Sequence, residues 1–86
     1  MKKIEMDDLV IRDGLYYLKF DDVPFTGRIY GPRQEGVFKD GKKDGLWVKY
    51  HDKGIYLESR GVYRDGKKRG LWSYYHPNGN PRWDVP

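Results

Sequence analysis

The sequence contains no cysteine, which excludes disulfide bridges and thiolate metal sites. It also lacks an apolar run of 18 residues, so we expect no transmembrane helix. No block of five like charges occurs, because 13 acidic residues are interspersed among 17 basic ones. The resulting net charge of +4 favours an acidic partner such as an anionic surface or an acidic protein face.

Sequence motifs of catalysis are missing as well. Ser59 and Ser73 are the only two serines, and neither lies in a G-x-S-x-G turn. The glycines do not form the phosphate-binding pattern G-x-x-x-x-G-K-[ST]. We therefore expect a protein that is not an enzyme and that uses no cofactor.

The N-terminus carries no complete export signal. Met1-Lys2-Lys3 resembles the start of a signal peptide, but Glu5 and Asp7 follow where an apolar stretch is required. The chain as given is expected to be cytoplasmic, and periplasmic or secreted if a leader peptide has been removed from it.

The main feature that is present is an internal repeat of 25 residues. Residues 36–60 and 61–85 align with 12 identical pairs, and both copies contain D-G-K-K-x-G-L-W. A fixed period of this length indicates stacked supersecondary units. Polar and apolar residues alternate at period two from Leu46 to His51, which is typical of a strand. Asp-Gly pairs at 40–41 and 65–66 favour tight turns, so each copy predicts one β-hairpin.

The repeat predicts an all-β fold, namely an elongated, twisted antiparallel sheet of consecutive hairpins without a helix. We expect about seven or eight short strands, at residues 9–12, 15–20, 27–31, 36–40, 45–51, 54–64, 70–75 and 80–84. Residues 1–8 are expected to be flexible. Residues 9–86 are expected to form a single domain, with degenerate hairpins over 9–35 followed by repeats at 36–60 and 61–85.

Aromatic residues make up 16% of the chain, so rings laid over the sheet can replace a thick aliphatic core. Each repeat places a glycine two residues before a tryptophan, at Gly45 and Gly70, and we expect the indole to cover that glycine. Tyr56 and Tyr63 on the strand between are expected to fill the gap between the two indoles. An aromatic ladder along one face would result.

The histidines are not expected to bind a metal. His51 and His76 occupy equivalent positions in the two copies, which places them two strands and about 9–10 Å apart. A metal lies only about 2 Å from an imidazole nitrogen, so the two rings cannot share one ion.

The pattern F/Y-K/R-D-G-K-K-x-G-L-W-x-x-Y-H-x-x-G resembles the MORN repeat, in the bacterial variant of the YwqK-type antitoxin family. The stretch DGLYYLKFDDVPFTGRIYG resembles the segment that often precedes such repeats, so the resemblance covers about residues 9–85. It implies an elongated sheet of consecutive antiparallel hairpins. It also implies a scaffolding or protein-binding role, association with lipid, or immunity against a secreted toxin.

Two sets of residues are candidates for binding a partner. Aromatic rings are favoured at interfaces and can also stack on bases, and the candidates of this type are Trp47, Tyr50, Trp72, Tyr74 and Tyr75. Cations at the turns would be aligned along one edge by the repeat, and these are Lys42, Lys43, Lys67, Lys68 and Arg69. Packing of the sheet and solubility are the alternative roles of the two sets.

The sequence predicts a non-enzymatic protein-binding module, and the family resemblance implies an antitoxin or immunity protein that blocks a toxin by direct binding. The alternative is a peripheral scaffold that binds anionic lipid or a membrane through the repeated lysine turns. Nucleic acid is a less favoured partner, and self-association through an open sheet edge is a further alternative. The net positive charge counts against a basic toxin as the partner.

Overall fold

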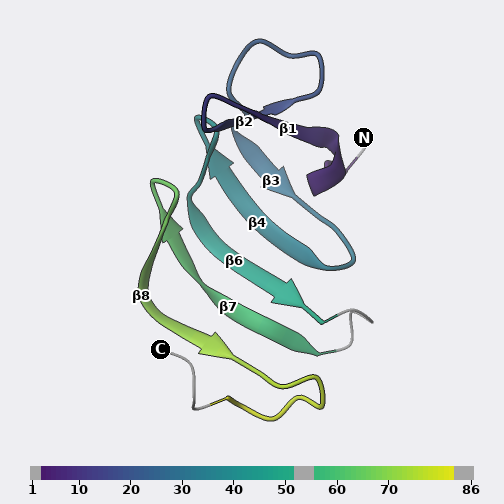
Figure 1. Cartoon of the computed structure of the whole chain (residues 1–86), viewed down its shortest axis with the longest axis vertical. Helices are drawn as coiled ribbons and strands as arrows, with labels where there is room; N and C mark the ends of the chain where they lie inside the picture. Colours follow the sequence, from purple (N-terminus) through teal and green to yellow (C-terminus); the bar gives the residue numbers. More distant parts are fainter. Residues whose placement is uncertain (1–2, 52–55, 83–86) are drawn as a thin grey trace.

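The computed structural model describes residues 3–51 and 56–82 of the 86-residue chain. Its strands pair antiparallel throughout, and the described part contains no α-helix, as the sequence predicted. None of the described residues belongs to a helix long and apolar enough to cross a membrane. The molecule is elongated, with extents of 41 × 26 × 20 Å (Figure 1).

Most of the chain forms one twisted sheet with a hairpin at one end. The sheet has the order β3-β4-β6-β7-β8, with strands β3 (Gly27–Ile29), β4 (Gln34–Lys39), β6 (Gly45–Tyr50), β7 (Leu57–Arg64) and β8 (Lys67–Tyr74). The short strand β5 (Lys42–Lys43) pairs with β4, off this path. The hairpin consists of β1 (Leu9–Arg12) and β2 (Leu15–Leu18). Figure 1 shows this hairpin at one end of the molecule and β8 at the other.

Seven of the eight predicted strands overlap observed ones, but β5 was not predicted, and β8 begins three residues before the predicted start at residue 70. In place of the strand predicted at 80–84, Pro81 forms a single bridge to Tyr75, and residues 83 and 84 lie outside the described part. At the other end, Met6–Asp8 forms one 3-10 turn, η1. The Tyr30 N–H donates to the Ile4 carbonyl at 2.7 Å, so the segment before β1 is hydrogen-bonded to the residue that follows β3.

The sequence repeat is a structural repeat of one hairpin. In both copies the turn residues have positive φ, 50° and 82° at residues 40–41 and 54° and 84° at residues 65–66. Such angles are what a two-residue hairpin turn requires and what Asp-Gly provides. The first copy is the hairpin of β4 with β5 and β6, and the second is the hairpin of β7 with β8.

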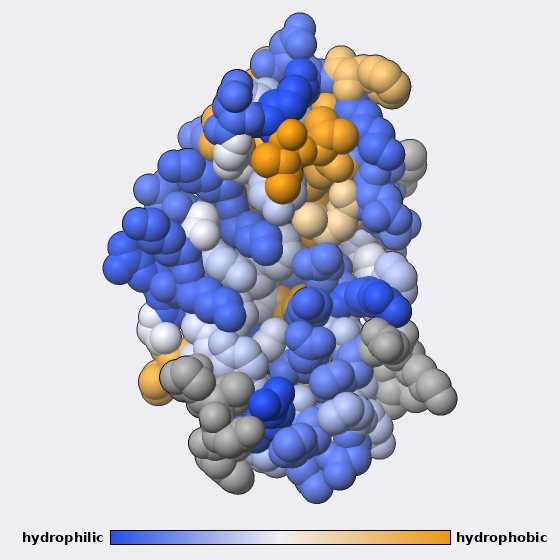
Figure 2. All heavy atoms as spheres, viewed as in Figure 1, coloured by the Kyte–Doolittle hydropathy of each residue, from blue (hydrophilic) through white to orange (hydrophobic). Residues whose placement is uncertain are grey.

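The core of the described chain is small and largely aromatic. Five hydrophobic residues are buried, namely Leu9, Phe25, Ile29, Phe38 and Trp47. Phe38 and Ile29 are fully enclosed, with no exposed area. Three of these five side chains are aromatic, as the composition led us to expect, and the core lies toward the β1–β2 end of the sheet. Figure 2 shows hydrophobic residues gathered near that end, whereas the surface over β6–β8 is mostly hydrophilic.

Each repeated tryptophan lies over a glycine of a neighbouring strand that comes earlier in the chain, which is β4 for Trp47 and β7 for Trp72. A Cβ atom at Gly36 would lie 2.1 Å from the Trp47 ring, and one at Gly61 would lie 2.2 Å from the Trp72 ring. Each indole N–H also donates to a backbone carbonyl of that preceding strand, at 2.9 Å for Trp47 and 3.2 Å for Trp72. The indole therefore joins two neighbouring strands by packing and by a hydrogen bond.

The prediction that the indoles cover Gly45 and Gly70 was wrong. A Cβ at Gly45 would meet Val37 at 3.4 Å, and one at Gly70 would have no neighbour within 4 Å. These two glycines instead take positive φ angles, 113° at the start of β6 and 64° within β8, where the register with β7 shifts. The prediction failed because the indole reaches across to the neighbouring strand and does not lie back along its own.

Candidate partner-binding site

A continuous series of aromatic rings crosses the sheet, and we call it the aromatic ladder. Its members are Tyr16, Phe38, Trp47, Tyr63, Trp72 and Tyr74. Centroids of successive rings lie 4.9, 5.3, 5.8, 5.0 and 6.5 Å apart, and the three central pairs meet nearly edge to face. The prediction that Trp47 and Trp72 share one face, with Tyr63 between them, is confirmed.

Tyr56 is not a member of the ladder, contrary to the prediction. Its side chain is 47% exposed and lies against Gly79, where a Cβ would approach the Tyr56 ring to 2.8 Å. Tyr56 precedes β7 and lies beyond the bulge between Lys49 and Tyr50, which shifts the register of the β6–β7 pair. Tyr56 also lies seven residues before Tyr63, and residues an odd number apart in a strand point to opposite faces, so alternation alone argued against placing both in the ladder.

Two repeat-equivalent lysines lie on the ladder. The Lys43 Nζ atom is 4.7 Å from the Trp47 ring centroid and 5.0 Å from that of Tyr63. The Lys68 Nζ atom is 4.7 Å from the Trp72 centroid and 5.3 Å from that of Tyr74. Both are cation–π contacts, in which the ring face attracts the ammonium group. The repeat therefore places a cation beside each indole.

A shallow pocket with a volume of about 190 Å³ opens over these residues, and we call it the ladder pocket. Its lining includes four ladder rings, from Trp47 to Tyr74, together with Lys43, Lys49 and Lys68. Glu58 is the carboxylate that lines it. Three ammonium groups and one carboxylate leave the lining with an excess of positive charge.

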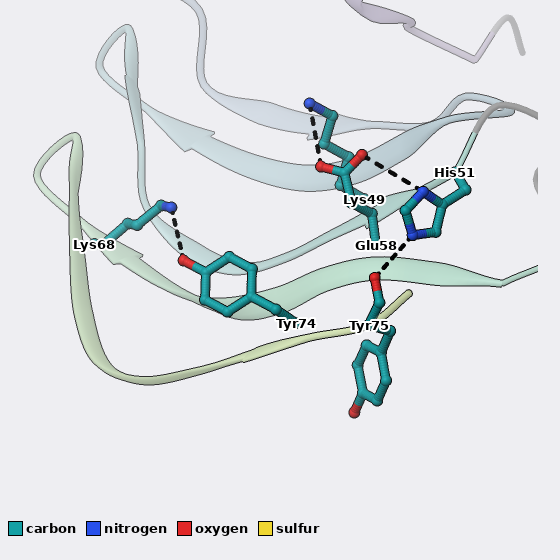
Figure 3. A network of polar contacts seen from close by, with 6 residues as sticks. All are labelled: Lys49, His51, Glu58, Lys68, Tyr74 and Tyr75. Atoms are coloured by element: carbon teal, nitrogen blue, oxygen red, sulfur yellow. Dashed lines mark hydrogen bonds and ion pairs between the residues drawn. The ribbon is translucent and has the colours of Figure 1, made fainter. Parts of the chain in front are cut away.

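The carboxylate of the ladder pocket lies between the side chains of Lys49 and His51 (Figure 3). One oxygen of Glu58 lies 3.6 Å from the Lys49 Nζ atom, and the other lies 4.0 Å from His51 Nδ1. His51 Nε2 donates to the carbonyl oxygen of Tyr75 at 2.9 Å, so this nitrogen carries a proton. Within the described residues, Lys43 and Lys68 form no ion pair with a carboxylate.

The two ladder lysines differ electrostatically. Burial lowers the pKa of Lys43 below its ordinary value, and repulsion from Lys49 and Lys68 lowers it further. The pKa of Lys68 is raised, chiefly because its ammonium group donates a hydrogen bond to the Tyr74 hydroxyl at 3.0 Å. The surroundings of Lys43 thus disfavour the charged form of its side chain.

This difference should be measurable by NMR titration of the lysine side chains between about pH 8 and pH 12, around the ordinary lysine pKa. We expect the Nζ resonance of Lys43 to titrate at lower pH than that of Lys68. Lys49→Ala should move the Lys43 midpoint upward, because it removes one of the repelling charges. Lys67→Ala serves as the control and should leave the Lys43 midpoint in place. A Lys43 midpoint at or above that of Lys68 would contradict the described geometry.

The structure divides the candidate cations between two sides of the sheet. Lys42 and Lys67 precede the ladder lysines by one residue, and successive strand residues point to opposite faces. Lys42 forms an ion pair with Asp65 at 3.4 Å. Arg69 pairs in register with Val62, whose neighbour Tyr63 belongs to the ladder, so Arg69 also lies on the side away from it.

Among the aromatic candidates, Trp47, Trp72 and Tyr74 line the ladder pocket, and Tyr50 and Tyr75 do not. Tyr50 is held by its backbone, because its N–H donates to the Arg33 carbonyl at 2.6 Å. Tyr75 contributes its carbonyl to His51, and Figure 3 shows its ring pointing away from the Lys68–Tyr74 pair.

Lys49 and Glu58 were missed as site residues. Lys49 follows Trp47 by two residues, and this spacing alone would have placed it on the ladder side. Glu58 could be placed only once the register between β6 and β7 was known, because its partner Lys49 lies on the other strand.

Comparisons with protein-family models, with curated proteins and with solved structures found no match. The resemblance to MORN repeats therefore remains a prediction based on the repeated motif.

Proposed function

We propose that this protein is a non-enzymatic module that binds an acidic segment of a partner protein at the ladder pocket. The observation that carries the proposal is the pair of repeat-equivalent lysines, Lys43 and Lys68, each lying on an indole ring at the pocket. Rings offer apolar contact to a partner, and the neighbouring cations offer charge complementarity.

The charge balance of the pocket supports an anionic group as the occupant. Glu58 is engaged by Lys49 and His51, so it does not neutralise the two ladder lysines. The lowered pKa of Lys43 reflects a positive charge that is partly buried and repelled by two other ammonium groups. A carboxylate from a partner would remove that repulsion, and the free energy gained would favour the complex.

The MORN-like motif supports a finer proposal, in which the partner is a toxin that is blocked by direct binding. With a net charge of +4, the chain requires a toxin that presents acidic side chains to the ladder pocket. A toxin with a basic surface would be repelled by Lys43 and Lys68.

Peripheral binding to anionic lipid is the weaker proposal. A flat membrane contacts one side of a protein at a time, whereas the repeated lysines alternate between the two sides of the sheet. Lys42 is also engaged by Asp65. An acidic protein segment can enter a pocket, and a planar surface cannot.

A pair of charge-matched variants tests the proposal. The variant Lys43→Ala/Lys68→Ala removes the two ladder cations, and Lys42→Ala/Lys67→Ala removes two cations from the other side at the same change in net charge. Proteins captured from the native cell by the wild-type chain should bind the first variant at least about tenfold more weakly, because close interfacial charge pairs contribute about 1.5 kcal/mol or more. The second variant should bind almost normally.

Binding is best quantified by calorimetry with the captured partner, after circular dichroism has shown that both variants are folded. Equal losses in the two variants, together with flotation on vesicles of anionic lipid, would favour the lipid role. A partner that binds both variants as tightly as the wild type would place the interface away from the ladder pocket.

A further inference from the structure

Strand β8 is the last strand of the sheet, and in residues 3–51 and 56–82 one of its two edges is largely unpaired. In the described part of the chain no strand pairs with the outer edge of β8 between Lys67 and Ser73. At the far end, Pro81 bridges to Tyr75, and the Arg82 N–H donates to the Tyr74 carbonyl at 2.8 Å. An open edge presents backbone N–H and C=O groups that can pair with an added strand.

The internal repeat specifies what such a strand should carry. The segment Gly70–Tyr74 of β8 is the 25-residue equivalent of Gly45–Lys49 in β6, and the corresponding edge of β6 is occupied by β7. There, Tyr63 lies opposite Gly45, and Gly61 lies opposite Trp47. By the same register, a strand added antiparallel to β8 would place an aromatic residue opposite Gly70.

The ladder shows the consequence of the open edge. In the first repeat, Lys43 lies between Trp47 of its own repeat and Tyr63 of the next strand. In the second repeat, Lys68 lies on Trp72 at the same distance, but its second ring is Tyr74 of its own strand. An aromatic side chain from an added strand would take the place beside Trp72 and Lys68 that Tyr63 takes beside Trp47 and Lys43.

The charge at this edge indicates an acidic residue in the added strand. Between the two repeats, Asp65 forms an ion pair with Lys42, and the Gly66 N–H donates to the Lys43 carbonyl at 2.9 Å. The equivalents of these lysines on β8 are Lys67 and Lys68, and Arg69 replaces the repeat-equivalent Asp44. Three successive cations at an open edge oppose pairing with another copy of β8 and favour an acidic residue two positions after the aromatic one.

We propose that the outer edge of β8 binds an extended segment of a partner protein by antiparallel strand addition. The segment has the pattern (β-branched)-aromatic-x-Asp/Glu, which the end of β7 and the turn after it fulfil as Val62-Tyr63-Arg64-Asp65. Backbone hydrogen bonds supply affinity in this binding mode, and alternate side chains supply specificity. The proposal deepens the proposed protein-binding function, and it rests on that function because the occupant is a segment of a protein.

A synthetic peptide with the sequence LESRGVYRDG, that of residues 57–66, is the probe. Added to the full-length protein labelled with nitrogen-15, it should cause saturable shifts of the backbone amides from Lys67 to Ser73 and of the Trp72 indole N–H. A control peptide carrying Tyr63→Ser should bind at least about tenfold more weakly, because it lacks the ring that would contact the Trp72 indole.

Methylation of single peptide nitrogens provides the sharper test. In an added strand every second N–H points toward β8, so methyl groups at alternate positions should weaken binding about tenfold, and those between should have little effect. This alternation is specific to strand addition. A peptide held by its side chains in the ladder pocket would not produce it.

Two results would overturn the inference. One is the absence of shifts at β8 with the peptide at about 1 mM, or binding without the alternation. The other is binding that occurs only after deletion of residues 83–86, because the chain's own C-terminal segment would then be the occupant. Failure of the peptide would leave the proposed function standing if the captured partner still distinguished Lys43→Ala/Lys68→Ala from its charge-matched control.

Discussion

Replacing Gly36 by alanine is expected to lower the free energy of unfolding by about 3 kcal/mol or more, which is the upper range for overpacking a core. The added Cβ would lie 2.1 Å from two carbons of the Trp47 ring, whereas carbon atoms in contact are about 3.5–4.0 Å apart. The indole cannot move aside without losing the hydrogen bond from its N–H to the Val37 carbonyl at 2.9 Å. Urea denaturation of the wild type and the variant measures the effect.

Gly70→Ala is the matched control for this prediction. Gly70 has a φ of 64°, but a Cβ placed on it would have no neighbour within 4 Å. Its replacement should therefore cost only the strain of the left-handed backbone, about 1–2 kcal/mol. If Gly70→Ala lowered the free energy of unfolding as much as Gly36→Ala or more, the Trp47 ring would not be the reason why residue 36 is a glycine.

Much of the fold follows from two sequence features, the period-two alternation and the 25-residue repeat. Alternation places Trp47 on one face of its strand and Leu46 on the other, and the structure shows Trp47 buried and Leu46 half exposed. The repeat then requires Trp72 to lie on the same face as Trp47. Both inferences need only the geometry of a strand and the rule that equivalent units stack equivalently.

The covered glycines could not be identified from the same features. The register of β4 changes between Glu35, which pairs with Val48, and Phe38, which pairs with Lys43. The segment of β5 and β6 that pairs with β4 therefore has more residues between these two pairs than β4 has. This irregularity places the Trp47 ring over Gly36. A bulge of this kind depends on packing between strands, which a single sequence does not display.

The ladder pocket was predictable in part. Lys43 lies four residues before Trp47, so the alternation alone distinguishes it from Lys42 and places it on the ladder side. The ion pair between Lys49 and Glu58 depends on the pairing of β6 with β7, whose register shifts at a bulge. The loop that joins these two strands has no turn signal strong enough to fix that register in advance.

Trp47→Ala is expected to lower the free energy of unfolding by about 4 kcal/mol, as is typical when a buried tryptophan is removed. Trp47 is only 4% exposed and meets the rings of Phe38 and Tyr63 at 5.3 and 5.8 Å. At about 0.05–0.15 kcal/mol per residue, a domain of this size has a total stability of the same order. The variant should therefore lose a large fraction of its stability, which thermal denaturation followed by circular dichroism would show as a much lower unfolding midpoint.

Trp72→Ala provides the comparison, since Trp72 is the same residue one repeat later. It lies at the last strand, is only partly buried, and makes the longer indole hydrogen bond of the two, at 3.2 Å. We expect about half the loss of Trp47→Ala, because a partly buried ring loses fewer packing contacts than a buried one when it is removed. Leu71→Ala, at a side chain that is 99% exposed, should leave the unfolding midpoint unchanged. Equal losses of stability on replacing Trp47 and Trp72 would mean that the Trp72 ring is covered as completely as the Trp47 ring. The edge of β8 would then have no room for an added strand.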